Sequence, residues 1–384
     1  MGPALQFIDL AEQQRRIKPE IDAAIARVLA HGKYIMGPEV VELEAKLCAF
    51  VDSKQCISVS NGTDALIVAL MAYGVGPGDA VITTPFTFFA TIEAILTLNA
   101  TPIFADIDAS TFNICPHEIK KAIIAARERT DLTVRGIMPV DLFGLPCNYQ
   151  EIMQVAQENN LFVIQDAAQA FGATTDGKRC PIHGDIGTTS FFPAKPLGCY
   201  GDGGAVFTDD EELAETIRSI RVHGKGEDKY DNVRLGKNAR LDTIQAAILL
   251  QKLAIYDDEL AARSRVAQQY AERFRDINDK LPATRQITTP SIDPSDASAW
   301  AQYTIRVPDR DGVRAKLSAI GIPSLVYYRT PSHLLRACEH LGERRGAFPC
   351  SEAAAKEVIS LPFHPYLEYR DIELITDAVL QCVA

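Results

Sequence analysis

Strand-like and helical stretches alternate along about the first 250 residues of this chain. Short buried-strand patterns occur at residues 55–60, 80–84, 102–107, 135–140, 161–165 and 204–208. Helical patterns occur at residues 39–50, 63–73 and 89–98, and a further helix is expected to begin near Pro116. Because parallel strands need crossover connections, the alternation predicts an α/β fold with a mostly parallel sheet covered on both faces.

The pattern changes from Leu241 onward. Residues 241–276 predict a nearly continuous helix, followed by a strand at 300–307, a helix at 311–319 and a strand at 324–328. The chain of 384 residues is long enough for two domains. We therefore expect a large domain at residues 1–253 and a smaller C-terminal α/β domain at residues 254–384.

The composition narrows the class of protein. There are 39 Lys and Arg residues against 50 Asp and Glu, a net charge of −11, which argues against nonspecific binding to nucleic acid or to an anionic membrane. No secretory signal pattern and no run of apolar residues long enough to cross a bilayer is visible in the sequence. The nine cysteines are scattered without metal-type spacing. These features predict a cytoplasmic enzyme with reduced thiols and no metal site.

Lys195 stands in the segment SFFPAKPLG, between aromatic residues and glycines. Desolvation by such neighbours lowers the pKa of an ammonium group and frees the amine as a nucleophile, which a Schiff-base enzyme requires. The alternative is an ordinary surface lysine in a loop.

Asp166 directly follows the apolar strand pattern LFVIQ. Ligands of open parallel sheets bind beyond the carboxyl ends of the strands, so this carboxylate is a candidate partner for a buried cation, such as a protonated pyridine nitrogen. The alternative is a helix N-cap.

Two further features point to the same kind of ligand. Gly62 and Thr63 lie in a turn between a strand and a helix, where free N–H groups attract an anion, and the hydroxyl of Ser190 is a candidate for the same anion. Phe88 could stack on a planar ring or pack in the core. Together with Asp166 and Lys195, these residues match pyridoxal phosphate (PLP) chemistry.

Several segments make this match specific. The chain resembles the DegT/DnrJ/EryC1/StrS family of PLP-dependent nucleotide-sugar aminotransferases, which have the aspartate-aminotransferase fold (fold type I). The resemblance runs nearly end to end, through KYIMGPEVVELE (33–44), SNGTDAL (60–66), PFTFFAT (85–91), DAAQ (166–169), SFFPAK (190–195), GKNARLDTIQAA (236–247) and SLPFHP (360–365).

The resemblance implies roles for individual residues. Lys195 would carry the cofactor as a Schiff base, and Asp166 would pair with its ring nitrogen. Gln169 would contact the side of the ring that bears the hydroxyl, and Phe88 would stack on the ring. The phosphate would be held by Gly62, Thr63 and Ser190, with Asn238 reaching in from the second subunit of a homodimer that shares its active sites.

The segment RVHGKGEDKYDNVR (221–234) resembles the branch that transfers an amino group from L-glutamate to UDP-2-acetamido-2-deoxy-3-keto-glucuronate, in the biosynthesis of surface polysaccharides such as lipopolysaccharide O-antigen. The candidate sugar-binding residues are His223, Lys225, Lys229, Arg240 and Tyr328, although a solvated basic loop is an alternative for them. At Arg329 this chain differs from close relatives of that branch, which often carry a proline-rich stretch at the corresponding position. Its guanidinium could bind a sugar carboxylate or instead alter nucleotide binding.

Other activities therefore stay open. The acceptor could be a neutral 3-keto UDP-GlcNAc or a 3- or 4-keto 6-deoxy nucleotide sugar. A PLP-dependent dehydratase or a non-catalytic regulatory protein are further alternatives, although the presence of Lys195 favours transamination.

Overall fold

A seven-stranded sheet forms the centre of the computed structural model, within the residues that it describes (5–128, 131–228 and 230–383). The strand order is β1-β9-β8-β5-β4-β2-β3. The bounds are β1 Gln55–Val59, β2 Asp79–Thr83, β3 Thr101–Phe104, β4 Thr133–Ile137, β5 Phe162–Asp166, β8 Ile186–Ser190 and β9 Gly204–Thr208. β9 runs antiparallel to both neighbours, and the other pairs are parallel. The predicted mostly parallel α/β sheet is thus confirmed.

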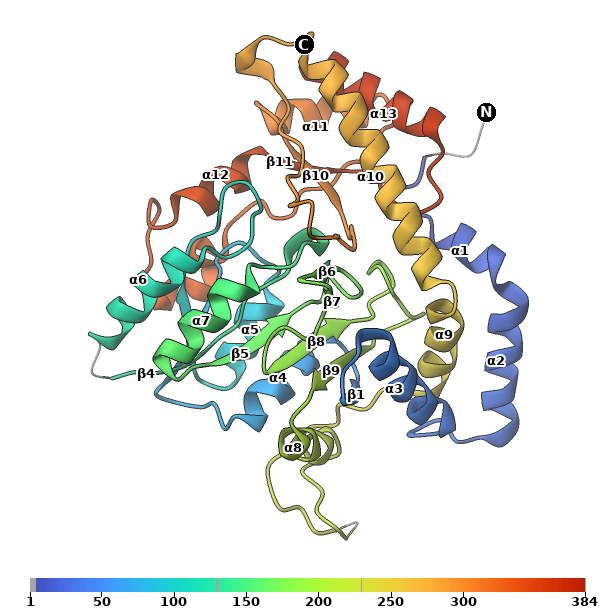
Figure 1. Ribbon diagram of the computed structural model, residues 1–384, viewed down its shortest axis with the longest axis vertical. Coiled ribbons are helices and arrows are strands. Elements are labelled where there is room, and N and C mark those ends of the chain that lie inside the picture. The colour runs from blue at the N-terminus through green and yellow to red at the C-terminus, as the bar shows by residue number, and fades with distance from the viewer. Residues whose placement is uncertain (1–4, 129–130, 229, 384) are drawn as a thin grey trace.

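Helices cover both faces of this sheet (Figure 1). The α-helices of the described residues are α1 Leu10–Arg16, α2 Lys18–His31, α3 Pro38–Val51, α4 Gly62–Ala72, α5 Ala90–Thr97, α6 Pro116–Arg127, α7 Tyr149–Asn159, α8 Glu211–Arg221, α9 Thr243–Leu253, α10 Tyr256–Asn278, α11 Arg310–Ala319, α12 Pro349–Glu357 and α13 Tyr369–Val383. Successive strand residues point to opposite faces, so Ile164 of β5 belongs to the hydrophobic core on the side of α4 and α8, whereas Val163 belongs to the core on the side of α6 and α7.

One strand of the sheet, β8, is not predicted from the sequence. β8 reads IGTTS, which has few bulky apolar side chains, yet every residue of it is buried. A side chain at Gly187 would collide with the carbonyl of Pro181, so this position accepts only glycine. β8 thus owes its place to close packing between β5 and β9, and hydrophobicity alone does not reveal it.

The predicted, nearly continuous helix at 241–276 is present as two helices, α9 and α10, which a turn at Ala254 and Ile255 separates. Tyr256, immediately after the turn, is fully buried and donates a hydrogen bond of 2.6 Å to the carbonyl of Phe171. This hydrogen bond and the burial of the ring fix the start of α10 against the sheet domain.

The C-terminal part has its own hydrophobic core around β10 Tyr303–Arg306 and β11 Val358–Leu361, which pair antiparallel. Side chains of α10, α11 and α13 complete this core, which lies above the large sheet in Figure 1. The predicted strand at 324–328 is wrong, because only a single bridge joins Leu325 to Ser360. The domain boundary at 253/254 stays a prediction, and it falls beside the turn between α9 and α10. A small hairpin, β6 Thr174–Thr175 and β7 Lys178–Arg179, completes the strands of the described residues.

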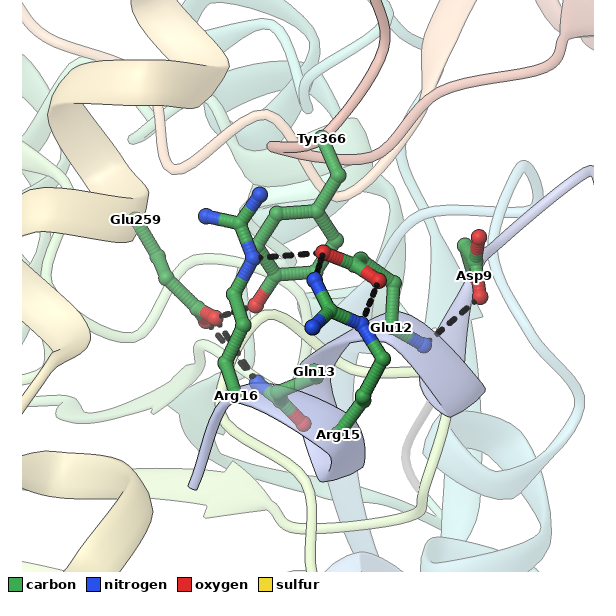
Figure 2. A network of polar contacts seen from close by, with 7 residues as sticks. All are labelled: Asp9, Glu12, Gln13, Arg15, Arg16, Glu259 and Tyr366. Atoms are coloured by element: carbon green, nitrogen blue, oxygen red, sulfur yellow. Dashed lines mark hydrogen bonds and ion pairs between the residues drawn. The ribbon is translucent and has the colours of Figure 1, made fainter. Parts of the chain in front are cut away.

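The N-terminal helix α1 contacts α10 and the segment that follows β11 through a polar network (Figure 2). Glu259 of α10, buried, accepts hydrogen bonds of 3.1 and 2.9 Å from the side-chain amide of Gln13 and another from the hydroxyl of Tyr366. The guanidinium of Arg16 lies 4.3 Å from the centre of the Tyr366 ring. Because Tyr366 follows β11, these contacts fasten α1 to the C-terminal part of the chain.

Candidate active site

Lys195 lies in the loop between β8 and β9 and is only partly exposed. Its backbone N–H donates to the carbonyl of Phe192 at 2.8 Å, which forms a tight turn. Burial lowers the pKa of the Lys195 amine to about 8, although the attraction of Asp166 works in the opposite direction. A substantial fraction of the amine is therefore neutral, and nucleophilic, slightly above neutral pH.

Asp166 is the last residue of β5 and is 4% exposed. Its carboxylate accepts hydrogen bonds from the hydroxyl of Thr91 at 2.8 Å and from the N–H of Ala168 at 3.2 Å. Burial raises the pKa of this carboxyl, while both hydrogen bonds and Lys195 lower it. No helix begins at Ala167 in the described chain, so the helix N-cap alternative is wrong. A buried carboxylate of this kind is stabilised by a cation.

Gly62, Thr63 and Ser190 come together at the start of α4. Asn61 caps this helix, since its side chain accepts from the N–H of Asp64 at 2.7 Å. A Cβ atom on Gly62 would lie 2.6 Å from the Cβ of Ser190, so only glycine allows this approach. Free N–H groups at a helix N-terminus beside a serine hydroxyl form a site for a phosphate group.

Phe88, Gln169 and Tyr328 form a third group. The Gln169 side chain accepts from the N–H of Phe143 at 2.8 Å and donates to the hydroxyl of Tyr328 at 3.2 Å. The rings of Tyr328 and Phe88 are 6.2 Å apart, and Phe88 is 58% exposed. Phe88 therefore has a free aromatic surface and is not a core residue. Tyr328, expected at the sugar, also contacts a residue expected at the cofactor.

The remaining candidates lie elsewhere. His223 and Lys225 belong to the loop that extends beyond α8 (Figure 1), and their contacts with described residues are to α8 and to the loop itself. The structure does not bring these two into contact with Lys195 or Asp166. Lys229 lies outside the described residues.

Asn238 and Arg240 line a cavity of about 480 Å³ together with Ser60 and Asn61. The Nε of Arg240 donates to the Asn238 side chain at 2.9 Å. This cavity therefore adjoins the turn at the start of α4. Arg329 is exposed directly after Tyr328 and forms no ion pair with any residue that the structure describes.

Sequence reasoning did not assign a role to Thr91, the donor to Asp166. Thr91 and Thr87 hydroxyls lie 2.9 Å apart, and both residues are buried. Thr91 lies in the first turn of α5, whereas Thr87 lies in the bend before it, so their closeness depends on the path of the chain into the helix and helical spacing does not reveal it.

These residues fit PLP. The turn at Gly62 can hold its phosphate, Asp166 its protonated ring nitrogen, Phe88 the ring face and Lys195 its aldehyde carbon. The bound cofactor would supply an electron sink for breaking bonds at an amino acid α-carbon. Among the described residues, no cluster of three or more His, Cys, Asp or Glu is arranged to hold a metal, and no helix there is long and apolar enough to cross a membrane. Fold and site together define a fold type I PLP-dependent aminotransferase.

Comparison with known proteins agrees with this class. The model of the DegT/DnrJ/EryC1/StrS aminotransferase family matches residues 15–380, and the chain belongs to this family. It is 46% identical over 375 residues to UDP-2-acetamido-2-deoxy-3-oxo-D-glucuronate aminotransferase of Pseudomonas aeruginosa, covering 98% of this chain and 99% of the relative. It is 37% identical over 379 residues to UDP-N-acetyl-3-dehydro-alpha-D-glucosamine 3-aminotransferase of Acidithiobacillus ferrooxidans, covering 98% and 97%.

Solved structures support the fold equally well. A DegT DnrJ EryC1 StrS aminotransferase from Brucella abortus has a TM-score of 0.93 and 47% identity, covering 98% of both chains. NtdA from Bacillus subtilis with bound cofactor PMP has a TM-score of 0.86 and 31% identity, covering 95% of this chain and 81% of that chain. The predicted family, fold and class, a PLP-dependent nucleotide-sugar aminotransferase, are thus confirmed.

Proposed function

We propose that this enzyme transfers the amino group of L-glutamate to C3 of UDP-2-acetamido-2-deoxy-3-keto-glucuronate. The reaction consumes glutamate and the keto sugar and releases 2-oxoglutarate and the 3-amino sugar. The observation that carries the acceptor assignment is Arg329, an exposed guanidinium that forms no ion pair with any described residue and follows Tyr328 in the chain. A guanidinium in this state is available to bind a carboxylate through two parallel hydrogen bonds. The Pseudomonas aeruginosa relative, which is named for a 3-oxo-glucuronate, supports the same assignment.

Each residue of the site has a proposed role. Lys195 attaches the cofactor, and after the donor displaces it, its amine moves a proton away from the donor α-carbon. A pKa of about 8 suits a group that must act as both acid and base. Asp166 keeps the ring nitrogen protonated, with Thr91 holding the carboxylate in position.

The other residues would orient the ligands. Gly62, Thr63 and Ser190 hold the phosphate, Phe88 stacks on the ring, and Gln169 hydrogen-bonds beside the ring hydroxyl. We assign the sugar nucleotide to His223, Lys225, Arg240 and Tyr328.

We further propose a homodimer in which Asn238 and Arg240 complete the partner's site. Exposed apolar side chains near this segment support the proposal, since Leu235 is 89% exposed, and Tyr34 and Ile35 are also exposed. Isolated exposed hydrophobic residues are ordinary, but several close to one functional segment are typical of an interface.

The product would enter the assembly of a surface polysaccharide such as O-antigen, with the enzyme in the cytoplasm. The neutral 3-keto UDP-GlcNAc remains the second candidate acceptor, supported by the name of the Acidithiobacillus ferrooxidans relative.

The test uses the PLP-loaded enzyme in two half-reactions. L-Glutamate should remove the visible absorbance band of the cofactor and release 2-oxoglutarate. The amino-loaded enzyme is then mixed separately with the 3-keto uronate, the neutral 3-keto sugar and 4-keto 6-deoxy nucleotide sugars. We expect the band to return fastest with the uronate, with mass spectrometry detecting the amino sugar. Faster return with a neutral sugar would overturn the acceptor assignment, and no response to glutamate would overturn the whole proposal.

A further inference from the structure

The loop that carries Lys195 is closed on itself by backbone hydrogen bonds. The N–H of Phe191 donates to the carbonyl of Gly203 at 2.8 Å, and the N–H of Cys199 donates to the carbonyl of Phe191 at 2.8 Å. A Cβ atom on Gly198 would lie 2.6 Å from the carbonyl oxygens of both Phe192 and Pro193, so the turn around Lys195 is packed tightly. The position of the Lys195 backbone therefore depends on the returning limb of the loop, residues 198–201.

Lys252 of α9 binds the returning limb at Gly198. It is 1% exposed, and its ammonium group donates a hydrogen bond of 2.6 Å to the carbonyl of Gly198. The same group lies 4.3 Å from the centre of the Tyr200 ring. Burial lowers the pKa of Lys252 to about 8, so the group remains mostly charged at neutral pH. A buried ammonium ion is costly, and a carbonyl together with an aromatic face are the partners that stabilise it.

Gln245, also on α9, binds the returning limb at a second residue, Tyr200. Its side-chain oxygen accepts from the N–H of Tyr200 at 2.9 Å, and its amide nitrogen lies 3.4 Å from the Tyr200 carbonyl. Gln245 and Lys252 are seven residues apart, two turns of the helix, so both side chains leave α9 on the same face. The helix itself is firmly seated, because most of its side chains are buried.

We propose that Lys252 and Gln245 are positioning residues for the amine of Lys195. They fix the carbonyl of Gly198 and the backbone of Tyr200 against α9, and so fix the loop from which Lys195 reaches the cofactor. This inference rests on the proposed role of Lys195 as the attachment site. Neither residue touches the reacting atoms, and a shift of about 1 Å in the placement of a reacting group can slow a reaction about a hundredfold.

The experiment separates placement of Lys195 from integrity of the cofactor pocket. The full chain is freed of cofactor and reloaded with PLP, and covalent attachment is followed by absorbance, with borohydride reduction and peptide mass spectrometry locating the label. Binding of pyridoxamine phosphate is measured in parallel, since this compound has no aldehyde and cannot react with Lys195. We expect Lys252→Met, which keeps the length of the side chain but loses its charge, to slow attachment at least about tenfold. Its affinity for pyridoxamine phosphate should stay that of the wild type.

Three further variants sharpen the test. Lys252→Arg should restore much of the attachment rate, because it retains a charged donor. Gln245→Met should slow attachment independently, which keeps the inference testable if Lys252→Met does not fold. Gln251→Ala is the matched control, since this partly buried residue of α9 hydrogen-bonds only the helix carbonyl of Ala247 among the described residues.

Attachment at the wild-type rate in both Lys252→Met and Gln245→Met would overturn the inference. Equal losses of PLP attachment and pyridoxamine phosphate affinity would also overturn it, because they indicate a general structural role. A wild-type label on a lysine other than Lys195 would instead overturn the proposed function.

Discussion

The hydroxyl of Thr91 donates a hydrogen bond of 2.8 Å to the carboxylate of Asp166, at the carboxyl end of β5. Asparagine at position 166 can still accept the hydrogen bond from Thr91. Asp166→Asn should therefore keep this contact but remove the negative charge that holds a proton on the nitrogen of the cofactor ring. We expect the single-turnover rate with L-glutamate to fall more than about tenfold, or about 1.4 kcal/mol of barrier. Thr91→Val keeps the charge of Asp166 and removes one hydrogen bond to it, so this variant should raise the barrier of the same single turnover by about 1 kcal/mol. A smaller loss in Asp166→Asn than in Thr91→Val would contradict the assignment.

The lowered pKa of Lys195 predicts the pH dependence of PLP attachment. Because the neutral amine is the nucleophile, the attachment rate to cofactor-free protein should rise with pH through a midpoint near 8, well below the ordinary lysine value of 10.5. The Asp166 carboxylate favours the ammonium form, so Asp166→Asn should move the midpoint to lower pH. Stopped-flow absorbance across neutral and alkaline pH measures both midpoints. A wild-type midpoint at the ordinary lysine value would show that burial does not tune this amine.

Replacing the reactive amine separates catalysis from binding. Lys195→Ala should abolish turnover but still bind PLP noncovalently, because the turn at Gly62, the carboxylate of Asp166 and the ring of Phe88 are unchanged. Equilibrium dialysis measures the binding, and release of 2-oxoglutarate measures turnover. Wild-type turnover in this variant would remove the central claim.

Arg329 distinguishes an acidic acceptor from a neutral one. If Arg329 binds the sugar carboxylate, Arg329→Ala should lower kcat/KM for the 3-keto uronate, which corresponds to a loss of about 1.5–3 kcal/mol of transition-state stabilisation. The kcat/KM for the neutral 3-keto sugar should stay almost unchanged. Arg336→Ala is a suitable control, since Arg336 is another exposed arginine nearby in the chain. Equal losses on both sugars in Arg329→Ala would point to a role with the nucleotide or in folding.

Shared active sites predict complementation between two inactive variants. Mixing Lys195→Ala with Arg240→Ala chains should give mixed dimers with one intact site and one doubly damaged site. Random mixing should recover roughly a quarter of wild-type activity, by the reciprocity of a two-fold interface. Co-purification of differently tagged chains verifies the exchange. Mixed dimers that form, bind PLP and stay inactive would mean that Arg240 acts within its own chain.

The network around Glu259 should contribute to stability. Tyr366→Phe removes one donor from this buried carboxylate, so we expect the free energy of unfolding to fall by about 1–3 kcal/mol. Lys46→Gln breaks an exposed ion pair with Glu42 and should change it by no more than about 0.5 kcal/mol. Denaturant titration followed by circular dichroism measures both. Equal changes in the two variants would mean that the buried network contributes no more than a surface pair.

Much of the molecule is determined locally in the sequence. The strands at β1, β2, β5 and β9 are predictable because apolar runs bounded by turns leave few alternatives to a buried strand. The aromatic neighbours of Lys195 and the position of Asp166 after an apolar strand likewise identify both residues from the sequence alone. The lowered pKa of Lys195 follows the expected direction, since desolvation depends on neighbours that are partly adjacent in the chain.

Only the tertiary structure decides the features that depend on contacts between distant residues. β8 is packed where Gly187 fits against Pro181, and the start of α10 is fixed where Tyr256 is buried against Phe171. The same holds for the bond from Thr91 to Asp166 and for that from Lys252 to Gly198. The pattern of apolar residues along a segment is local, and it indicates which side of that segment is buried. It does not indicate which distant side chain supplies a hydrogen bond. That choice is made when the elements pack, because a buried polar group is stable only where a partner meets it.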